Sequence, residues 1–317
     1  MQYRKMGKSD VEISVMTMGC WALAGGRTWG PQDEEDAIAA LKTAVDCGIN
    51  FFDTAEGYGN GRSEELVGRA LGNVRDKILI ATKVSSNHLR PKDLRAACEG
   101  SLKALGTDYI DVYYIHWPNW DVPIEETLGT MESLKQDGKI RFIGCSNFGQ
   151  QDLTELFQYG RVEIDQLPYN LLCRAIEYEI LPTCIEHKVS VACYSPLLHG
   201  ILTGKFETLD DIPAGRARSR HFSAEREHTR HGGAGAEALT AETLDKIQKI
   251  CQDAGLSMTT VIAGARNPEQ VDANVKAALT PLPDDVAEAL RQATEPLKEE
   301  LGSNADLWES EEKSRIR

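Results

Sequence analysis

Short apolar runs that end at polar side chains alternate with amphipathic segments along most of this chain. Between about residue 14 and residue 204 there are seven candidate strands, namely VMTMGC, INFFDTA, KILIATKV, IDVYYIH, IRFIGCS, IDQLPYN and VSVACYS. Several intervening segments, at 34–48, 63–72, 92–105 and 124–138, place apolar residues at helical spacing. Repeated strand and helix alternation predicts an α/β fold with a parallel sheet, here closed as a barrel. The run TTVIAG at 259–264 supplies the eighth strand of a (β/α)8 barrel.

Four ionisable residues, Asp53, Tyr58, Lys83 and His116, lie at or just beyond the ends of three of these runs. Chemistry in a β/α barrel takes place at the C-terminal ends of the strands. A nearby ammonium lowers the pKa of a phenol, and a carboxylate holds that ammonium charged and in place. We therefore expect Tyr58 to act as a general acid. Plainer interpretations are an ordinary loop tyrosine, a buried Asp/Lys structural ion pair and a core histidine.

Length and composition favour one barrel domain over residues 1–317, with a long loop at about 205–238 and a C-terminal tail at about 300–317. The loop is either functional, folding over a cofactor, or disordered. The tail either covers the barrel mouth or is mobile. The formal net charge of -14 disfavours a nucleic-acid partner. No apolar stretch approaches the roughly eighteen residues of a membrane helix, and no signal-peptide pattern follows the N-terminus. We expect a cytoplasmic protein, and the sequence does not indicate its oligomeric state.

The eight cysteines are scattered through predicted strands and helices. None falls in a CxxC pair, and no Cys/His cluster has zinc-ligand spacing. We therefore expect reduced thiols and no metal site.

The strings DTAEGYG, IATKV, YYIHWP, GCSNF, CYSPL and GARNPEQ, in this order, resemble the aldo/keto reductase superfamily over nearly the whole chain. The resemblance implies a TIM barrel that binds NADP(H), less often NAD(H), without a Rossmann domain, and reduces carbonyls to alcohols. Its catalytic tetrad falls on Asp53, Tyr58, Lys83 and His116. Tyr58 would protonate the carbonyl oxygen while the nicotinamide delivers hydride to the carbonyl carbon, and His116 would orient the carbonyl.

The resemblance also implies cofactor contacts at matching positions. Those at the nicotinamide are Trp21, Ser146, Asn147, Gln166 and Tyr194, with the two amides and the serine holding the carboxamide and the tyrosine stacking on the ring. Those at the pyrophosphate are Ser195, Leu197, Gly200, Leu202 and Lys205. Those at the adenosine phosphate are Gly264, Arg266, Gln270 and Asn274, beside a helix expected to begin with Asn267 as N-cap and Pro268 in its first turn. Taken singly, each could instead be structural.

Many relatives carry a basic residue at the position of Gln270, so a 2′-phosphate would need Arg266 or Arg218 instead; free surface arginines are the alternative for both. Trp21 and Trp117 are expected to wall the pocket for a small-molecule carbonyl substrate. Loops determine which substrate is used in this architecture, and the sequence does not reveal their shape.

One segment departs from the family pattern. After KIQKICQDAGLSM the chain enters TTVIAGARN directly, where relatives usually carry a further amphipathic helix. We therefore expect a shortened helix region between strands 7 and 8, which either exposes apolar surface or marks a join across a missing segment. Two other interpretations stay open: a cofactor-binding regulatory subunit, like the potassium-channel β subunits that resemble the same superfamily, and a family-derived barrel that folds poorly.

Overall fold

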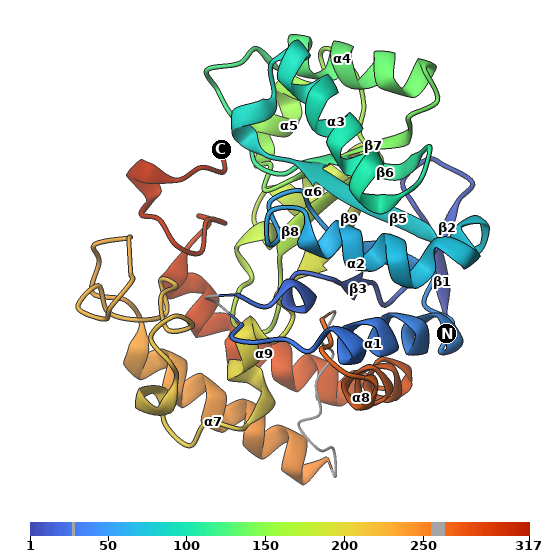
Figure 1. Cartoon of the computed structure of the whole chain (residues 1–317). Coiled ribbons are helices and arrows are strands. Elements are labelled where there is room, and N and C mark those ends of the chain that lie inside the picture. The colour runs from blue at the N-terminus through green and yellow to red at the C-terminus, as the bar shows by residue number, and fades with distance from the viewer. Residues whose placement is uncertain (27–28, 255–263) are drawn as a thin grey trace.

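A curled sheet of parallel strands forms the centre of the computed structural model, which describes residues 1–26, 29–254 and 264–317 (Figure 1). Within these residues the strand order is β3-β4-β5-β6-β7-β8-β9. The strands are β3 (Met18–Gly19), β4 (Phe51–Asp53), β5 (Leu79–Val84), β6 (Ile110–Ile115), β7 (Ile140–Ser146), β8 (Ile164–Pro168) and β9 (Ser190–Tyr194). Each lies in one of the seven predicted runs, so the prediction of a parallel α/β sheet is confirmed.

The eighth predicted strand, 259–264, lies outside the described residues except for Gly264. That glycine forms a parallel bridge with Gly19 of β3, the first strand of the sheet. Pairing between the last and first strands is what closes a barrel. The expected shortening of the helix region concerns 255–263, which is also outside the described residues, and stays a prediction.

Helices surround the sheet (Figure 1). Their bounds are α1 (Glu34–Asp46), α2 (Arg62–Leu71), α3 (Pro91–Leu105), α4 (Ile124–Gln136), α5 (Gln150–Leu156), α6 (Ile180–His187), α7 (Glu237–Asp253), α8 (Pro268–Leu279) and α9 (Asp284–Leu301). Helices α1 to α6 contact one another in chain order, α8 contacts α1, and α7 packs against α9. The predicted start of α8 is confirmed, because the Asn267 side chain accepts a hydrogen bond from Gln270 N and Pro268 follows it.

Side chains on the strands alternate between the barrel interior and the surrounding helices. On β4, Phe51 belongs to an inner cluster, whereas Phe52 belongs to the larger cluster beneath the helices. Asp53 follows Phe51 at a spacing of two residues, so it faces the interior. Lys83 of β5 is related in the same way to the inner residue Ala81.

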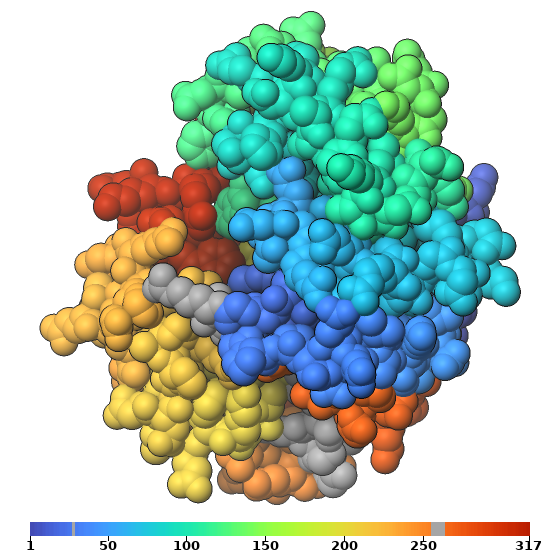
Figure 2. Space-filling model, viewed as in Figure 1, coloured from blue at the N-terminus to red at the C-terminus, as the bar shows by residue number. Residues whose placement is uncertain are grey.

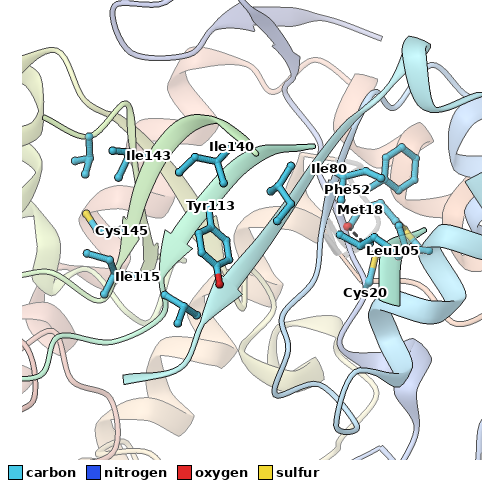
Figure 3. Packing of buried hydrophobic residues seen from close by; sticks show 14 of the residues in the cluster. Met18, Cys20, Phe52, Ile80, Leu105, Tyr113, Ile115, Ile140, Ile143 and Cys145 are labelled. Carbon is cyan, nitrogen blue, oxygen red and sulfur yellow. Dashed lines mark hydrogen bonds between the residues drawn. The ribbon is translucent and has the colours of Figure 1, made fainter. Parts of the chain in front are cut away.

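Strand β6 follows the same alternation. Figure 3 shows Tyr113 and Ile115 packed in the outer cluster with residues of neighbouring strands. Tyr114 belongs to the inner cluster, and His116 comes two residues later, just past the strand. The two-residue period therefore brings the ionisable ends of β4, β5 and β6 to one interior edge.

Three parts of the fold carried no specific prediction. They are an antiparallel hairpin of β1 (Tyr3–Lys5) and β2 (Glu12–Ser14), the helices α5 and α6, and α9. The predicted long loop contains a single-turn 3-10 helix (Leu209–Asp211) before α7 begins. Among the described residues, no helix is both long and apolar enough to cross a membrane.

Candidate active site

A cavity of about 1290 Å³ lies over the C-terminal ends of the strands and extends into the barrel. The predicted site residues on its wall are Trp21, Asp53, Tyr58, His116, Trp117, Ser146, Asn147, Gln166, Tyr194, Ser195, Leu197, Gly200, Lys205, Arg218, Gly264, Arg266, Gln270 and Asn274. Two predicted residues do not reach it. Lys83 is fully buried behind the wall, and the Leu202 side chain packs in a hydrophobic cluster around residues such as Leu172 and Ile212. Only the backbone of Leu202 could therefore approach a cofactor, and the expected pyrophosphate contact at this position stays a prediction.

Lys83 is held by three oxygen acceptors. Its Nζ donates to Asp53 Oδ1 at 2.6 Å, to Thr54 O at 2.8 Å and to Tyr58 Oη at 3.2 Å. An ammonium has three N–H groups, so these bonds use all of them. The buried charge is fully paired, and one of its partners is the phenol that faces the cavity.

Asp53 and the loop that carries Tyr58 are held in turn by hydrogen bonds from residues on or next to other strands. Gln166 Nε2 of β8 donates to Asp53 Oδ2 at 2.8 Å, across the barrel interior. Glu56, between the aspartate and the tyrosine, accepts a 2.7 Å hydrogen bond from Ser85 N at the end of β5. It also contacts His88 Nδ1 at 2.9 Å. These contacts tie the Tyr58 loop to the strand that carries the lysine.

The pKa of Tyr58 is raised rather than lowered, which corrects the sequence-based expectation. Burial raises it most, Lys83 lowers it, and Asp53 raises it again. For Lys83, burial alone would lower the pKa, but Asp53 and Tyr58 together raise it. Tyr58 is therefore a neutral phenol at physiological pH, a group that can give a proton, beside a lysine that stays charged.

His116 is neutral as well. Burial, followed by the charge of Lys83, lowers its pKa to about 3. Its ring lies edge-on to Tyr58, with the two ring centroids 5.8 Å apart. A neutral imidazole can donate one hydrogen bond to an oxygen placed beside Tyr58, but it is not a proton source near pH 7.

Hydroxyl, amide and aromatic groups gather at the ends of β7, β8 and β9. Asn147, in the left-handed conformation with φ 64°, donates from Nδ2 to His116 O at 3.0 Å. Tyr194 Oη donates to Asn147 Oδ1 at 2.8 Å, and Ser146 Oγ donates to Gln166 O at 3.0 Å. A flat aromatic face beside hydroxyl and amide groups suits a planar ring that bears a carboxamide.

The segment after β9 has backbone geometry suited to an anion. Ser195, Leu198, His199 and Gly200 all have positive φ, a conformation that is uncommon outside glycine. Leu198 N and Gly200 N donate to Ser195 O and Leu197 O within this turn, so it is the compact, glycine-bearing backbone that allows an anion to approach closely. A Cβ at Gly200 would lie 2.8 Å from Lys205 Nζ, so the ammonium lies directly against this turn.

The N-terminus of α8 bounds the same end of the cavity. Arg266 donates from Nε to Gln32 Oε1 at 2.6 Å and from its terminal nitrogens to Trp29 O and Pro31 O. Its backbone N donates to Gln270 Oε1 at 2.9 Å. Arg266 therefore holds the 29–32 segment beside the cavity, whose wall Arg216 and Arg218 also line.

The charge on the cavity wall is opposite to that of the whole chain. Asp53 is its only carboxylate among the described residues, whereas Lys205, Arg216, Arg218 and Arg266 surround the end near β9 and α8. Burial and the neighbouring Arg216 lower the pKa of Lys205, as expected for cations crowded together. The wall thus fits an elongated ligand with a planar amide at one end and phosphates at the other.

Several wall residues were not predicted from the sequence. Trp308 and Arg315 come from the C-terminal tail, and His199 and Arg216 come from loops. Trp308 lies 6.2 Å from Trp117 between ring centroids and is parallel to Tyr194 at 6.4 Å. The tail thus reaches the cavity wall, which agrees with the first of its two interpretations, and Trp308 is its single aromatic residue.

The aldo/keto reductase family model matches residues 15–295. An NADH-specific methylglyoxal reductase of Escherichia coli is 34% identical over 92% of this chain and 98% of that protein. A probable voltage-gated potassium channel subunit beta of Oryza sativa is 31% identical over 92% of this chain and 97% of that protein.

Solved structures agree with the sequence relatives. A glycerol dehydrogenase from Gluconobacter oxydans is 30% identical, covers 92% of this chain and 94% of its own, and has a TM-score of 0.78. An aldo-keto reductase from Klebsiella pneumoniae in complex with NADPH is 26% identical, covers 92% and 95%, and has a TM-score of 0.71. The predicted (β/α)8 barrel fold is thereby confirmed, and the chain belongs to the aldo/keto reductase family.

Proposed function

We propose that this protein is an NADP(H)-dependent oxidoreductase that reduces an aldehyde or ketone to an alcohol. The observation that carries the proposal is the Tyr58 hydroxyl on the cavity wall, 3.2 Å from a Lys83 ammonium that is itself paired with Asp53. A cofactor of this class supplies the hydride when it is bound. A protein group must then give a proton to the carbonyl oxygen, and Tyr58 is the proton donor.

The four ionisable residues divide the proton chemistry between them. A substrate oxygen beside Tyr58 Oη and the His116 ring receives a hydrogen bond from each. As Tyr58 gives up its proton, negative charge grows on Oη, and Lys83 stabilises it across the existing hydrogen bond. Asp53 keeps the ammonium in place. In the alcohol-oxidising direction the same phenolate takes the proton back.

The cationic end of the cavity supports NADP(H) as the cofactor, with NAD(H) as the alternative. Arg218 or the remaining N–H groups of Arg266 would face the 2′-phosphate, while the left-handed turn beside Lys205 would hold the pyrophosphate. Ser146, Asn147 and Gln166 would hold the carboxamide. The E. coli relative is described as NADH-specific, and the K. pneumoniae relative binds NADPH, so both cofactors belong in the test.

The test is the oxidation of NADPH and NADH, followed by absorbance, with a panel of aldehydes and ketones that includes methylglyoxal. Tyr58→Phe removes only the proposed proton donor. Tyr113→Phe is the matched control, since Tyr113 is buried on the helix side of β6, away from the cavity. We expect turnover that Tyr58→Phe abolishes and Tyr113→Phe retains; equal turnover in both variants refutes the proposed role of Tyr58.

A second candidate is a cofactor-binding regulatory subunit. The 31% identity to a potassium channel subunit beta favours it over other non-catalytic roles. Saturable binding of NADPH without turnover of any carbonyl in the panel would support this function instead. A non-cooperative thermal melt of the wild-type protein would support the third interpretation, a poorly folded barrel.

A further inference from the structure

The long loop and the C-terminal tail are joined by one arginine. Arg220 donates from its side chain to the carbonyl oxygens of Leu301 at 2.7 Å, of Asp306 at 3.1 Å and of Asn304. Its own backbone N donates to Leu307 O at 2.8 Å. In Figures 1 and 2 the loop and the red C-terminal tail lie side by side at the rim of the molecule.

The Arg220 guanidinium donates hydrogen bonds to backbone carbonyl oxygens. Among the described residues it forms no ion pair with a carboxylate, and burial lowers its pKa. The planar guanidinium binds three carbonyl oxygens of the 301–306 segment at once. A lysine ammonium on a flexible side chain cannot reproduce this geometry. The contact therefore fixes the shape of the tail rather than neutralising a charge.

The tail residues that follow this contact build the cavity wall. Trp308 N donates to Asp306 Oδ1, and Arg315 pairs with both carboxylate oxygens of Asp306 at 2.8 and 2.9 Å. The Arg315 guanidinium also lies 4.0 Å from the ring centroid of Trp117. Trp308 is thus presented toward Tyr194 by a turn whose carbonyls Arg220 holds from outside the cavity.

We propose that Arg220 is a positioning residue for carbonyl recognition, acting through Trp308. The proposal rests on the proposed reductase function. The substrate lies between the nicotinamide site and the aromatic wall of Trp117 and Trp308, so a tail freed from Arg220 weakens substrate binding while leaving the proton donor and the cofactor site intact. Arg220 itself does not line the cavity.

The experiment compares Arg220→Met and Arg220→Lys with wild type. Arg226→Met is the matched control, because Arg226 lies in the same loop but pairs with Glu237 and Asp210 instead of the tail. We expect both Arg220 variants to raise KM for the best carbonyl substrate about tenfold while kcat changes less than threefold and the NADPH Kd less than twofold. Arg226→Met should leave KM within twofold of wild type.

Two further measurements separate this inference from the proposed function. Hydrogen exchange followed by mass spectrometry should show faster exchange across 304–316 in the Arg220 variants alone, whether or not the wild type turns over. Trp308→Ala should raise KM by itself and make the added Arg220→Met change nearly silent. Unchanged exchange in the tail, additive KM effects, or a cofactor Kd that rises as much as KM would each overturn the proposal. Absence of turnover in the wild type would instead refute the proposed function, and exchange would still decide whether Arg220 holds the tail.

Discussion

Lys83 and Asp53 provide the sharpest test of whether the buried ion pair serves catalysis or only stability. The perturbation is Lys83→Met, which keeps an unbranched side chain one atom shorter and removes its charge. Lys83 Nζ is 3.2 Å from the atom that becomes negative when Tyr58 gives up its proton. At an effective dielectric constant of about 20, two unit charges at that distance attract by about 5 kcal/mol.

Only part of a negative charge develops on Tyr58 Oη in the transition state, and the negative charge of Asp53 weakens the attraction to Lys83. With roughly half a charge on Tyr58 Oη, about 2–3 kcal/mol of stabilisation is lost, which corresponds to roughly a hundredfold decrease in kcat. The NADPH Kd should change little, because Lys83 does not reach the cavity wall. Steady-state kinetics with saturating cofactor and fluorescence titration of NADPH measure the two quantities.

Loss of the lysine also leaves a carboxylate at a buried site with Gln166 as its remaining side-chain partner. Breaking a buried pair in this way costs about 3–5 kcal/mol of stability. The double variant Asp53→Asn/Lys83→Met removes that unpaired charge. It should melt close to wild type and still turn over about a hundredfold more slowly. A double variant that regains turnover to within tenfold of wild type would refute the catalytic reasoning and leave a purely structural ion pair.

Three further predictions follow from the same geometry. The kcat/KM for carbonyl reduction should be flat between about pH 6 and 9. Tyr58 stays protonated in this range because its pKa is raised, and His116 stays neutral because its pKa is about 3. Alcohol oxidation needs the Tyr58 phenolate, so its kcat/KM should rise with pH over the same range. A pH-rate limb near 6.5 would contradict this assignment. Glu56→Ala should lower kcat about tenfold with the cofactor Kd unchanged, because the Tyr58 loop loses its hydrogen bond to Ser85 N. A single-turnover rate constant equal to that of wild type in stopped flow would show that this hydrogen bond is dispensable. Gly200→Ala should raise the NADPH Kd several-fold by calorimetry, since φ is 94° and a Cβ would meet the facing lysine ammonium, whereas Gly215→Ala, which meets nothing within 4 Å, should not.

The strands and the four catalytic candidates could be predicted because both depend on local pattern. Parallel strands buried on both faces read as apolar runs, and the two-residue period assigns Asp53 and Lys83 to the interior once the strand is recognised. Of the residues that the family motifs supplied for a cofactor, all but Leu202 line the cavity. The catalytic roles themselves stay predictions until the variants are measured.

The parts that were missed depend on tertiary structure. The direction of the Tyr58 pKa follows from how deeply the barrel buries the phenol, and no local pattern contains that quantity. Trp308 and Arg315 reach the cavity only because the tail folds back across the mouth. Arg216 lies in a loop without helix or strand periodicity, so nothing local indicates that it lines the cavity.

The contrast between a chain of net charge -14 and a cavity wall rich in Lys and Arg has a kinetic consequence. An anionic dinucleotide is repelled by most of the surface and attracted at one opening, so the field guides the encounter toward the mouth before any contact forms. At 0.1 M salt, electrostatic attraction is largely screened beyond about 10 Å, whereas the contacts inside the formed complex are screened much less. Added salt should therefore slow the capture of cofactor far more than it hastens its release, and the lifetime of the complex would be set by the short-range contacts within the cavity.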